Sequence, residues 1–170
     1  MNSGFSTCFS GHRFAPFDWT SSYDGHVFQI MLAKAVEDAV NDGCNCFYNG
    51  MAMGFDIIAA EVVIAQKAYH NANAALVSVI PFRGQEAKWT KAWKARHDAV
   101  LQAADEVIIL NESYVTGCYH ERNRYLVDNS QRLIAFYSGK AGGTQHTYDY
   151  AEEKGLNIIN LWGEVAGIGK

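Results

Sequence analysis

The feature that most constrains this chain is an alternation of short apolar runs, rich in β-branched and aromatic residues, with longer segments of helical periodicity. The apolar runs lie at residues 5–10, 44–49, 75–82, 106–111, 132–137 and 157–161. Between them, helical patterns occur at residues 25–42, 55–69, 86–104, 117–128 and 144–154. Strands that alternate with helices in this way are typical of a parallel sheet.

The predicted strands are nearly continuous apolar stretches, as in ALVSVI and EVIIL. Strands of this kind are buried on both faces, which requires helices on both sides of the sheet. We therefore predict an α/β fold: a Rossmann-like, doubly wound, mostly parallel sheet of about six strands with helices on both faces. Because no repeat, low-complexity tract or linker divides the 170 residues, we expect a single domain over residues 1–170.

Composition narrows the classes of function. Hydrophobic residues make up 49% of the chain and charged residues 19%, which is enough apolar material for a core. The formal net charge of −4 disfavours nucleic acid as the main partner.

The chain lacks a basic, apolar secretory start and any run of about 18 apolar residues, so we expect a cytoplasmic protein with no membrane association. The histidines show no ligand-like spacing with cysteine or acid, and we assign no metal.

Three glycine-containing segments each follow a predicted strand and precede a predicted helix, where open α/β sheets place their ligands. The first contains Gly11, His12 and Arg13. Gly11 permits close approach of the backbone, and the planar donor fork of Arg13 suits a phosphate. A plain turn with a surface arginine is the alternative.

The second segment contains Gly50, Met51, Gly54 and Asp56, and its spacing is not that of a G-x-G-x-x-G motif. Its glycines would let backbone N–H groups face an anion, with the dipole of the following helix adding attraction. Tight packing of the strand against the helix explains the same glycines equally well.

The third segment contains Gly142, Gly143 and Thr144, a composition suited to holding phosphate. Thr144 would cap the helix, donate to a ligand oxygen, or do both. Arg122 and Asn123 enter the preceding helix and would reach a ligand over the strand ends, although a surface salt bridge is the simpler interpretation of Arg122.

At these segments the sequence resembles the YpsA-like family of the SLOG superfamily, which also contains the DNA-processing protein DprA and the LOG phosphoribohydrolases. The similarity spans roughly residues 7–159 and consists of separate motifs in the same order. They are CFSGHR at 8–13, NGMAMGFDIIAAE at 49–61, IPFRGQEAKW at 80–89, GCYHERNRYLVDNS at 117–130 and GGTQHT at 142–147. The resemblance implies a Rossmann-like fold whose glycine loops hold a nucleotide, a nucleotide sugar or a related signalling molecule.

The resemblance leaves open whether the chain is an enzyme. LOG enzymes release a base from a nucleoside monophosphate with an arginine in a motif like HERK and a glutamate after a glycine loop. His120–Asn123 matches the first motif, which gives Arg122 the candidate catalytic role. The acid position falls on Asp149 in one alignment and on Thr147 in another.

We therefore expect a domain that binds or senses a nucleotide, such as a nucleoside monophosphate, ADP-ribose or an NAD-like molecule, with no required cofactor. Whether the chain forms a homodimer is left open. The first alternative is a LOG-like phosphoribohydrolase that uses Arg122 with Asp149, or with Asp56 or Glu61. The second is DprA-like single-stranded DNA binding through basic side chains near two tryptophans of one helical stripe: Arg83, Lys88, Lys91, Lys94 and Arg96, with Trp89 and Trp93.

Overall fold

A computed structural model describes residues 4–70 and 72–165. Its strands are β1 (Phe5–Gly11), β2 (Cys44–Asn49), β3 (Ala75–Ile80), β4 (Glu106–Ile109), β5 (Arg132–Phe136) and β6 (Asn157–Asn160). Its helices are α1 (Tyr23–Asn41), α2 (Phe55–His70), α3 (Lys91–Ala103), α4 (Cys118–Asp128) and α5 (Gly143–Glu153), followed by a short 3₁₀ turn at Trp162–Glu164.

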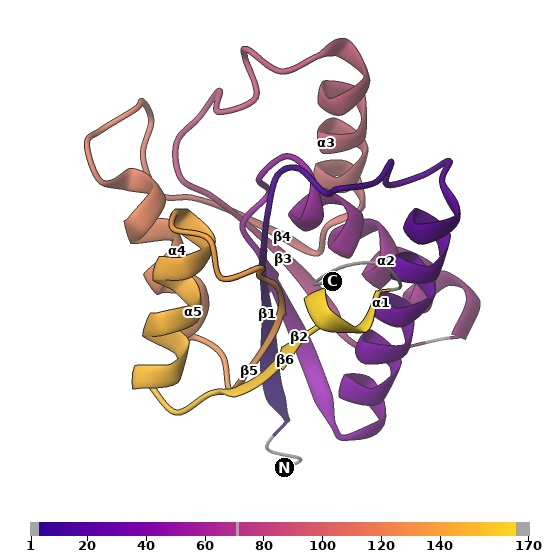
Figure 1. Ribbon diagram of the computed structural model, residues 1–170. Coiled ribbons are helices and arrows are strands. Elements are labelled where there is room, and N and C mark those ends of the chain that lie inside the picture. The colour runs from indigo at the N-terminus through magenta and orange to yellow at the C-terminus, as the bar shows by residue number, and fades with distance from the viewer. Residues whose placement is uncertain (1–3, 71, 166–170) are drawn as a thin grey trace.

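The strands of the described residues form one parallel sheet in the order β4-β3-β2-β1-β5-β6. Figure 1 shows α4 and α5 on one side of the sheet and α1 and α2 on the other. This arrangement confirms the predicted Rossmann-like sheet with helices on both faces. The strand order reverses between β1 and β5, so the connections that leave these strands diverge and open a crevice at their carboxyl ends.

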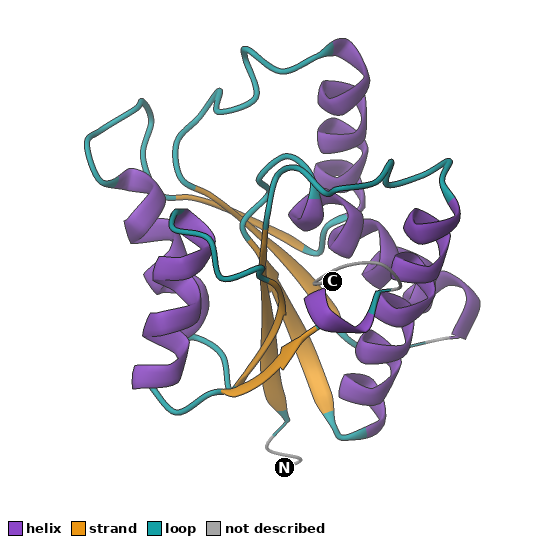
Figure 2. Ribbon diagram, viewed as in Figure 1, coloured by secondary structure: helices purple, strands orange, loops and turns teal. Residues whose placement is uncertain are grey.

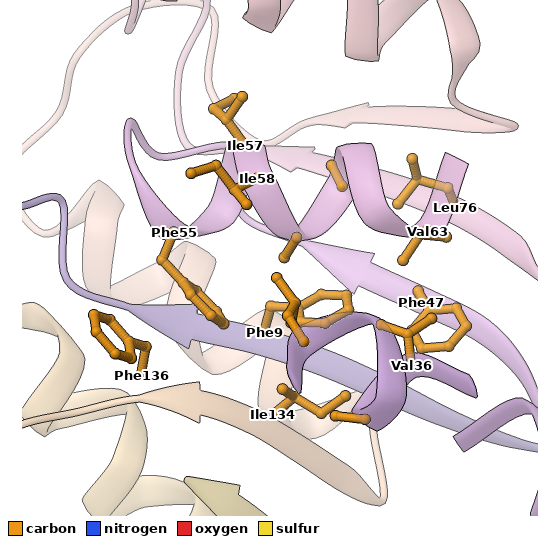
Figure 3. Packing of buried hydrophobic residues seen from close by; sticks show 14 of the residues in the cluster. Phe9, Val36, Phe47, Phe55, Ile57, Ile58, Val63, Leu76, Ile134 and Phe136 are labelled. Atoms are coloured by element: carbon orange, nitrogen blue, oxygen red, sulfur yellow. The ribbon is translucent and has the colours of Figure 1, made fainter. Parts of the chain in front are cut away.

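Two hydrophobic clusters hold the layers together. The larger lies between the sheet and the helices α1 and α2, and Figure 3 shows Phe9, Phe47 and Phe136 of the strands facing α2. The smaller packs α4 and α5 on the opposite face through Leu126 and Ala151. α2 is apolar around most of its circumference and most of its first turns are buried, as its sequence predicts.

The sequence places most elements to within two residues of their observed ends, but the helix predicted at residues 86–104 begins only at Lys91. Residues 82–89 form consecutive turns, in which Gly84 adopts φ +88°. Thr90 then caps α3, since its side chain accepts a hydrogen bond from the amide of Trp93. Trp89 therefore precedes the helix, and the predicted single stripe containing Trp89 and Trp93 is wrong.

All six strands point the same way, so their carboxyl ends lie at one edge of the sheet. In Figure 2 the loops that follow β1, β3, β4 and β5 rise at this edge. The predicted glycine segments all belong to these loops or to the loop that follows β2. Within the described part of the chain, no helix has the length and apolar character needed to cross a bilayer.

Candidate functional site

A cavity of about 520 Å³ lies at the carboxyl ends of β1 and β5, where the strand order reverses. Its walls come from the end of β1 and the loop that follows it, and from the amino-terminal turns of three helices. The lining residues are Phe9, Ser10, Gly11, His12 and Arg13 from β1 and its loop; Ala52 and Asp56 at the start of α2; Tyr119, His120, Arg122 and Asn123 of α4; and Gly142, Gly143, Thr144 and His146 at α5.

The loop after β1 supplies one neutral and one positively charged side chain. Nε2 of His12 accepts a hydrogen bond of 2.9 Å from the amide of Ser138. Burial, followed by the positive charge of Lys140, lowers the pKa of His12, which keeps the ring neutral at pH 7. Arg13 is exposed and has no ion pair within the described residues. Its guanidinium is therefore free to bind an anion.

The glycines of the second segment do not line the cavity but position the groups that do. The carbonyl of Gly50 accepts a hydrogen bond from Nη1 of Arg122. Gly54 adopts φ +88°, and a Cβ there would lie 2.2 Å from the carbonyl oxygen of Arg13. Met51 is fully buried, and its amide donates to Asn49. These contacts are those of tight packing, the alternative that the sequence left open, and the contact of the two glycines with an anion stays a prediction.

Arg122 is a buried side chain and not a surface salt-bridge residue. It is 6% exposed, and its guanidinium donates to the Gly50 carbonyl through Nη1 and to Oδ1 of Asn123 through Nε, the latter at 2.8 Å. Burial lowers the pKa of Arg122, and the negative charge of Asp56 opposes that effect. Because a guanidinium stays charged in proteins, the wall of the cavity carries a fixed positive charge.

Asp56 is the carboxylate that lines the cavity. It is 5% exposed, its Oδ2 accepts a hydrogen bond of 3.1 Å from the amide of Ala52, and its Oδ1 has no partner in the described residues. Burial raises the pKa of Asp56 to about 6, against the opposing effect of Arg122. Near neutral pH, the side chain of Asp56 therefore occurs both as the neutral acid and as the carboxylate.

The ring of Tyr119 lies near both arginines of the cavity. The guanidinium carbon of Arg13 lies 5.9 Å from the centre of this ring, and that of Arg122 lies 5.8 Å from it. Both distances allow a cation–π attraction, which eases the repulsion between the two like charges. No sequence pattern singles out this tyrosine, because the ring comes near both arginines only when the loop of Arg13 meets α4.

The amino terminus of α5 presents backbone donors. Gly142 is the N-cap and provides no side-chain cap. Thr144 is the second residue of the helix, so its predicted role as the cap is wrong. Among the described residues, the amides of Gly143 and Thr144 have no acceptor. Free amides at the positive end of a helix dipole attract anions.

The structure does not bring the other predicted acids into the cavity. Asp149 lies one and a half turns into α5 and lines a separate hollow with Arg124 and Glu153. Glu61 forms an ion pair of 2.6 Å with Arg96. Thr147 is buried and donates to the carbonyl of Gly143. Of the candidate acids, only Asp56 shares the cavity with Arg122.

Sequence reasoning also left His120 and His146 without a role, although both belong to the quoted motifs. Their ring centres lie 4.6 Å apart, and the two side chains line the cavity from α4 and α5. Elsewhere, one possible metal-ligand atom from each of Glu86, His97 and Asp98 lies within 4.8 Å of the other two. The sequence spacing of these residues did not predict this group. Glu86, His97 and Asp98 do not line the cavity.

The basic and aromatic residues considered for DNA binding do not form one free strip. Arg83 pairs with Glu112 at 2.8 Å and Arg96 pairs with Glu61 at 2.6 Å. The side chain of Arg96 also stacks on Trp93, with 4.5 Å between the guanidinium carbon and the ring centre. These pairs neutralise two of the five predicted cations.

The fold and the cavity define a Rossmann-like α/β domain with a positively charged site at its topological switch point. The chain belongs to the YpsA family: the model of that family, described as the YspA SLOG family, matches residues 8–158. This match confirms the resemblance seen in the motifs.

Similar proteins include the uncharacterized SPbeta prophage-derived protein YoqJ of Bacillus subtilis, 27% identical over 144 residues that cover 78% of this chain and 83% of YoqJ. A UPF0398 protein of Halalkalibacterium halodurans is 31% identical over 123 residues, which cover 69% of this chain and 65% of that protein.

Among solved structures, DprA of Helicobacter pylori, described with its single-stranded DNA binding mode, matches with a TM-score of 0.61 and 14% identity over 91% of this chain and 63% of DprA. DprA of Streptococcus pneumoniae matches with a TM-score of 0.59 and 17% identity over 91% of this chain and 49% of DprA. The chain thus spans less than two thirds of either DprA chain, and the likeness is one of fold.

Proposed function

We propose that the cavity binds the phosphate of a nucleotide or nucleotide-derived molecule. The observation that carries this proposal is the convergence of Arg13, Arg122 and the free amides of Gly143 and Thr144 on one cavity. Planar guanidinium groups and helix amino termini are the two donor types that proteins use most often for phosphate. One carboxylate, Asp56, faces two fixed cations, so the balance of charge favours an anion.

The size of the cavity fits the proposal. A volume of about 520 Å³ lies within the range of small-molecule sites, roughly 300–1,000 Å³. The site is also at the switch point of the sheet, where open α/β domains bind nucleotides. Membership of the SLOG family and the fold shared with DprA support nucleotide or DNA binding in general.

Thermal shift and calorimetric titration with AMP, ADP-ribose and NAD test the proposal. A ligand present at 100 times its Kd is expected to stabilise the folded protein by about 2.7 kcal/mol. Arg13→Ala removes an exposed cation from the cavity and is expected to weaken binding. Arg124→Ala is the matched control, because it removes an exposed arginine of α4 that does not line the cavity. Absence of stabilisation by all three ligands would contradict the proposal, as would equal effects of the two variants.

Hydrolysis of a nucleoside monophosphate is the second candidate, favoured by Asp56 beside Arg122 in the same cavity. Water would replace the base at the anomeric carbon and leave ribose 5-phosphate. The Asp56 carboxylate would stabilise the developing positive charge of the sugar, and Arg122 would hold the phosphate. Chromatography of AMP incubated with the protein tests this activity. Release of adenine by the wild type, together with its loss in Asp56→Asn, would support the hydrolase function. Equal release by Asp149→Ala and the wild type would show that Asp149 takes no part.

A further inference from the structure

A second cavity, of about 620 Å³, adjoins the proposed phosphate site. It lies between the β3–α3 loop and the residues that connect β4 to α4. Arg13 and Tyr119 line both cavities, so the two spaces share a wall. The IPFRGQEAKW motif at 80–89 forms much of the second cavity, and the proposed function gives that motif no role.

Three aromatic side chains form one side of this second cavity, and we call them the aromatic cluster: Phe82, Tyr114 and Tyr119. The ring centre of Phe82 lies 5.5 Å from that of Tyr114 and 5.9 Å from that of Tyr119, both edge to face. Tyr114 is 60% exposed. A large aromatic side chain held open beside a ligand cavity offers a face on which a planar ring can stack.

The loops that carry the aromatic cluster are fixed to each other. The amide of Arg83 donates to the carbonyl of Asn111 at 3.0 Å, and the side-chain amide of Asn111 donates to the carbonyl of Pro81 at 2.9 Å. Arg83 also pairs with Glu112 across the two loops. The surface is therefore formed before any ligand binds.

The charge of the second cavity continues that of the first. Arg13 and Lys88 line it, and neither forms an ion pair within the part of the chain that the structure describes. A molecule that crosses from one cavity to the other meets cations along the shared wall and aromatic rings beyond it. This sequence of groups matches a phosphate chain followed by a base.

We propose that the aromatic cluster is the base subsite of the ligand whose phosphate occupies the first cavity. This inference rests on the proposed function and narrows its ligand to an extended nucleotide with more than one phosphate or sugar unit, of the ADP-ribose type. The base stacks on Tyr114, and Arg13 contacts the phosphates at the boundary between the two cavities.

Calorimetric titration of the full chain with ADP-ribose and with ribose 5-phosphate tests the subsite. Ribose 5-phosphate carries the anion without a base. Tyr114→Ala is expected to weaken ADP-ribose binding by about tenfold, since stacking on an aromatic side chain contributes that much per base. The same variant leaves ribose 5-phosphate binding unchanged. Tyr114→Phe keeps the ring and restores the affinity for ADP-ribose, whereas Tyr114→Leu does not.

Tyr69→Ala is the matched control, because Tyr69 is 83% exposed near the end of α2, at the other edge of the sheet. It is expected to change neither affinity. If Tyr114→Ala leaves ADP-ribose binding unchanged while the wild type binds both probes, the base subsite is wrong and the phosphate site stands. If neither probe binds the wild type, the proposed function itself fails. Loss of binding to a single-stranded oligonucleotide in Tyr114→Ala, with ADP-ribose binding intact, would also overturn the subsite and assign the cluster to DNA.

Discussion

Two glycine-containing loops, β2–α2 and β5–α5, reach the same edge of the sheet and use glycine differently. A Cβ on Gly50 would lie 2.7 Å from Cδ of Arg122, and a Cβ on Gly54 would lie 2.2 Å from the carbonyl oxygen of Arg13. A Cβ on Gly142 or Gly143 would meet nothing within 4 Å among the described residues. The β2–α2 loop is packed, and the β5–α5 loop is open.

This difference separates two contributions to the site. In the packed loop, missing side chains let the backbone approach the guanidinium group of Arg122 and the backbone of Arg13. In the open loop, the glycines leave the amides of α5 uncovered for a ligand. The same residue type thus supports protein packing in one loop and ligand access in the other.

The largest effect is expected for Gly54→Ala in the packed loop. The added methyl clashes with the Arg13 backbone and the residue must also hold φ +88°, so we expect unfolding to become easier by about 4 kcal/mol. Gly139→Ala is the control, because Gly139 has φ +93° with open space around it and tests backbone strain alone. Urea denaturation measures both variants. Equal losses of stability in the two variants would show that the strained φ angle alone, and not the contact with Arg13, explains the effect of Gly54→Ala.

The next largest effect concerns Asp56 at the end of the packed loop. Burial raises its pKa from 3.8 to about 6, so the folded state favours the neutral acid. The stability that this preference contributes is fully present below pH 3.8 and is lost as the pH rises through about 6. Asp56→Asn is neutral at every pH. Its stability relative to the wild type should therefore rise by about 2–3 kcal/mol between acidic and neutral pH.

Urea denaturation of both proteins across this pH range measures the difference. A constant difference between Asp56→Asn and the wild type would mean that the carboxyl is not buried as described. The comparison uses the variant because the contributions of all other titratable groups are common to the two proteins and cancel.

A smaller effect on stability, with a clear effect on binding, is expected for Gly50→Ala. Its methyl meets the flexible side chain of Arg122 rather than backbone, so the guanidinium moves and the fold remains. We expect binding of ribose 5-phosphate to weaken by about tenfold, or about 1.4 kcal/mol. Calorimetry measures this loss. An unchanged affinity would show that the position of the Arg122 guanidinium does not affect the binding of ribose 5-phosphate.

The smallest change in stability is expected for Gly143→Ala in the open loop. Nothing lies near the added methyl, so the free energy of unfolding should change by no more than about 0.5 kcal/mol. Affinity for ribose 5-phosphate should nevertheless fall, because the methyl takes space beside the free amides. A loss of stability as large as that of Gly50→Ala would remove the distinction between the two loops.

The sequence predicts the fold well because its signals are local. The stripe of Phe28, Leu32 and Val36 repeats at helical spacing, and all three are buried in α1. The helix predicted from residue 86 fails for a local reason too. Thr90 is a typical N-cap residue, and it marks the start of α3 at Lys91.

The candidate site is less predictable because its contacts join distant segments. The residues of the hydrogen bond from Arg122 to Gly50 are 72 positions apart in the sequence. Burial of Arg122 and Asp56 depends on how α2 and α4 meet, which no spacing reveals. Alignment with the LOG motif places the acid at Asp149, whereas packing brings Asp56 to the cavity.

Backbone amide NMR of the ¹⁵N-labelled protein titrated with ribose 5-phosphate is the most direct test of the phosphate site. The amides of Gly143 and Thr144, together with those of His12 and Arg13, are expected to shift most, since they line one cavity at the switch point. Shifts confined to residues at the opposite edge of the sheet, or no saturable shift at all, would contradict the presence of an anion site there.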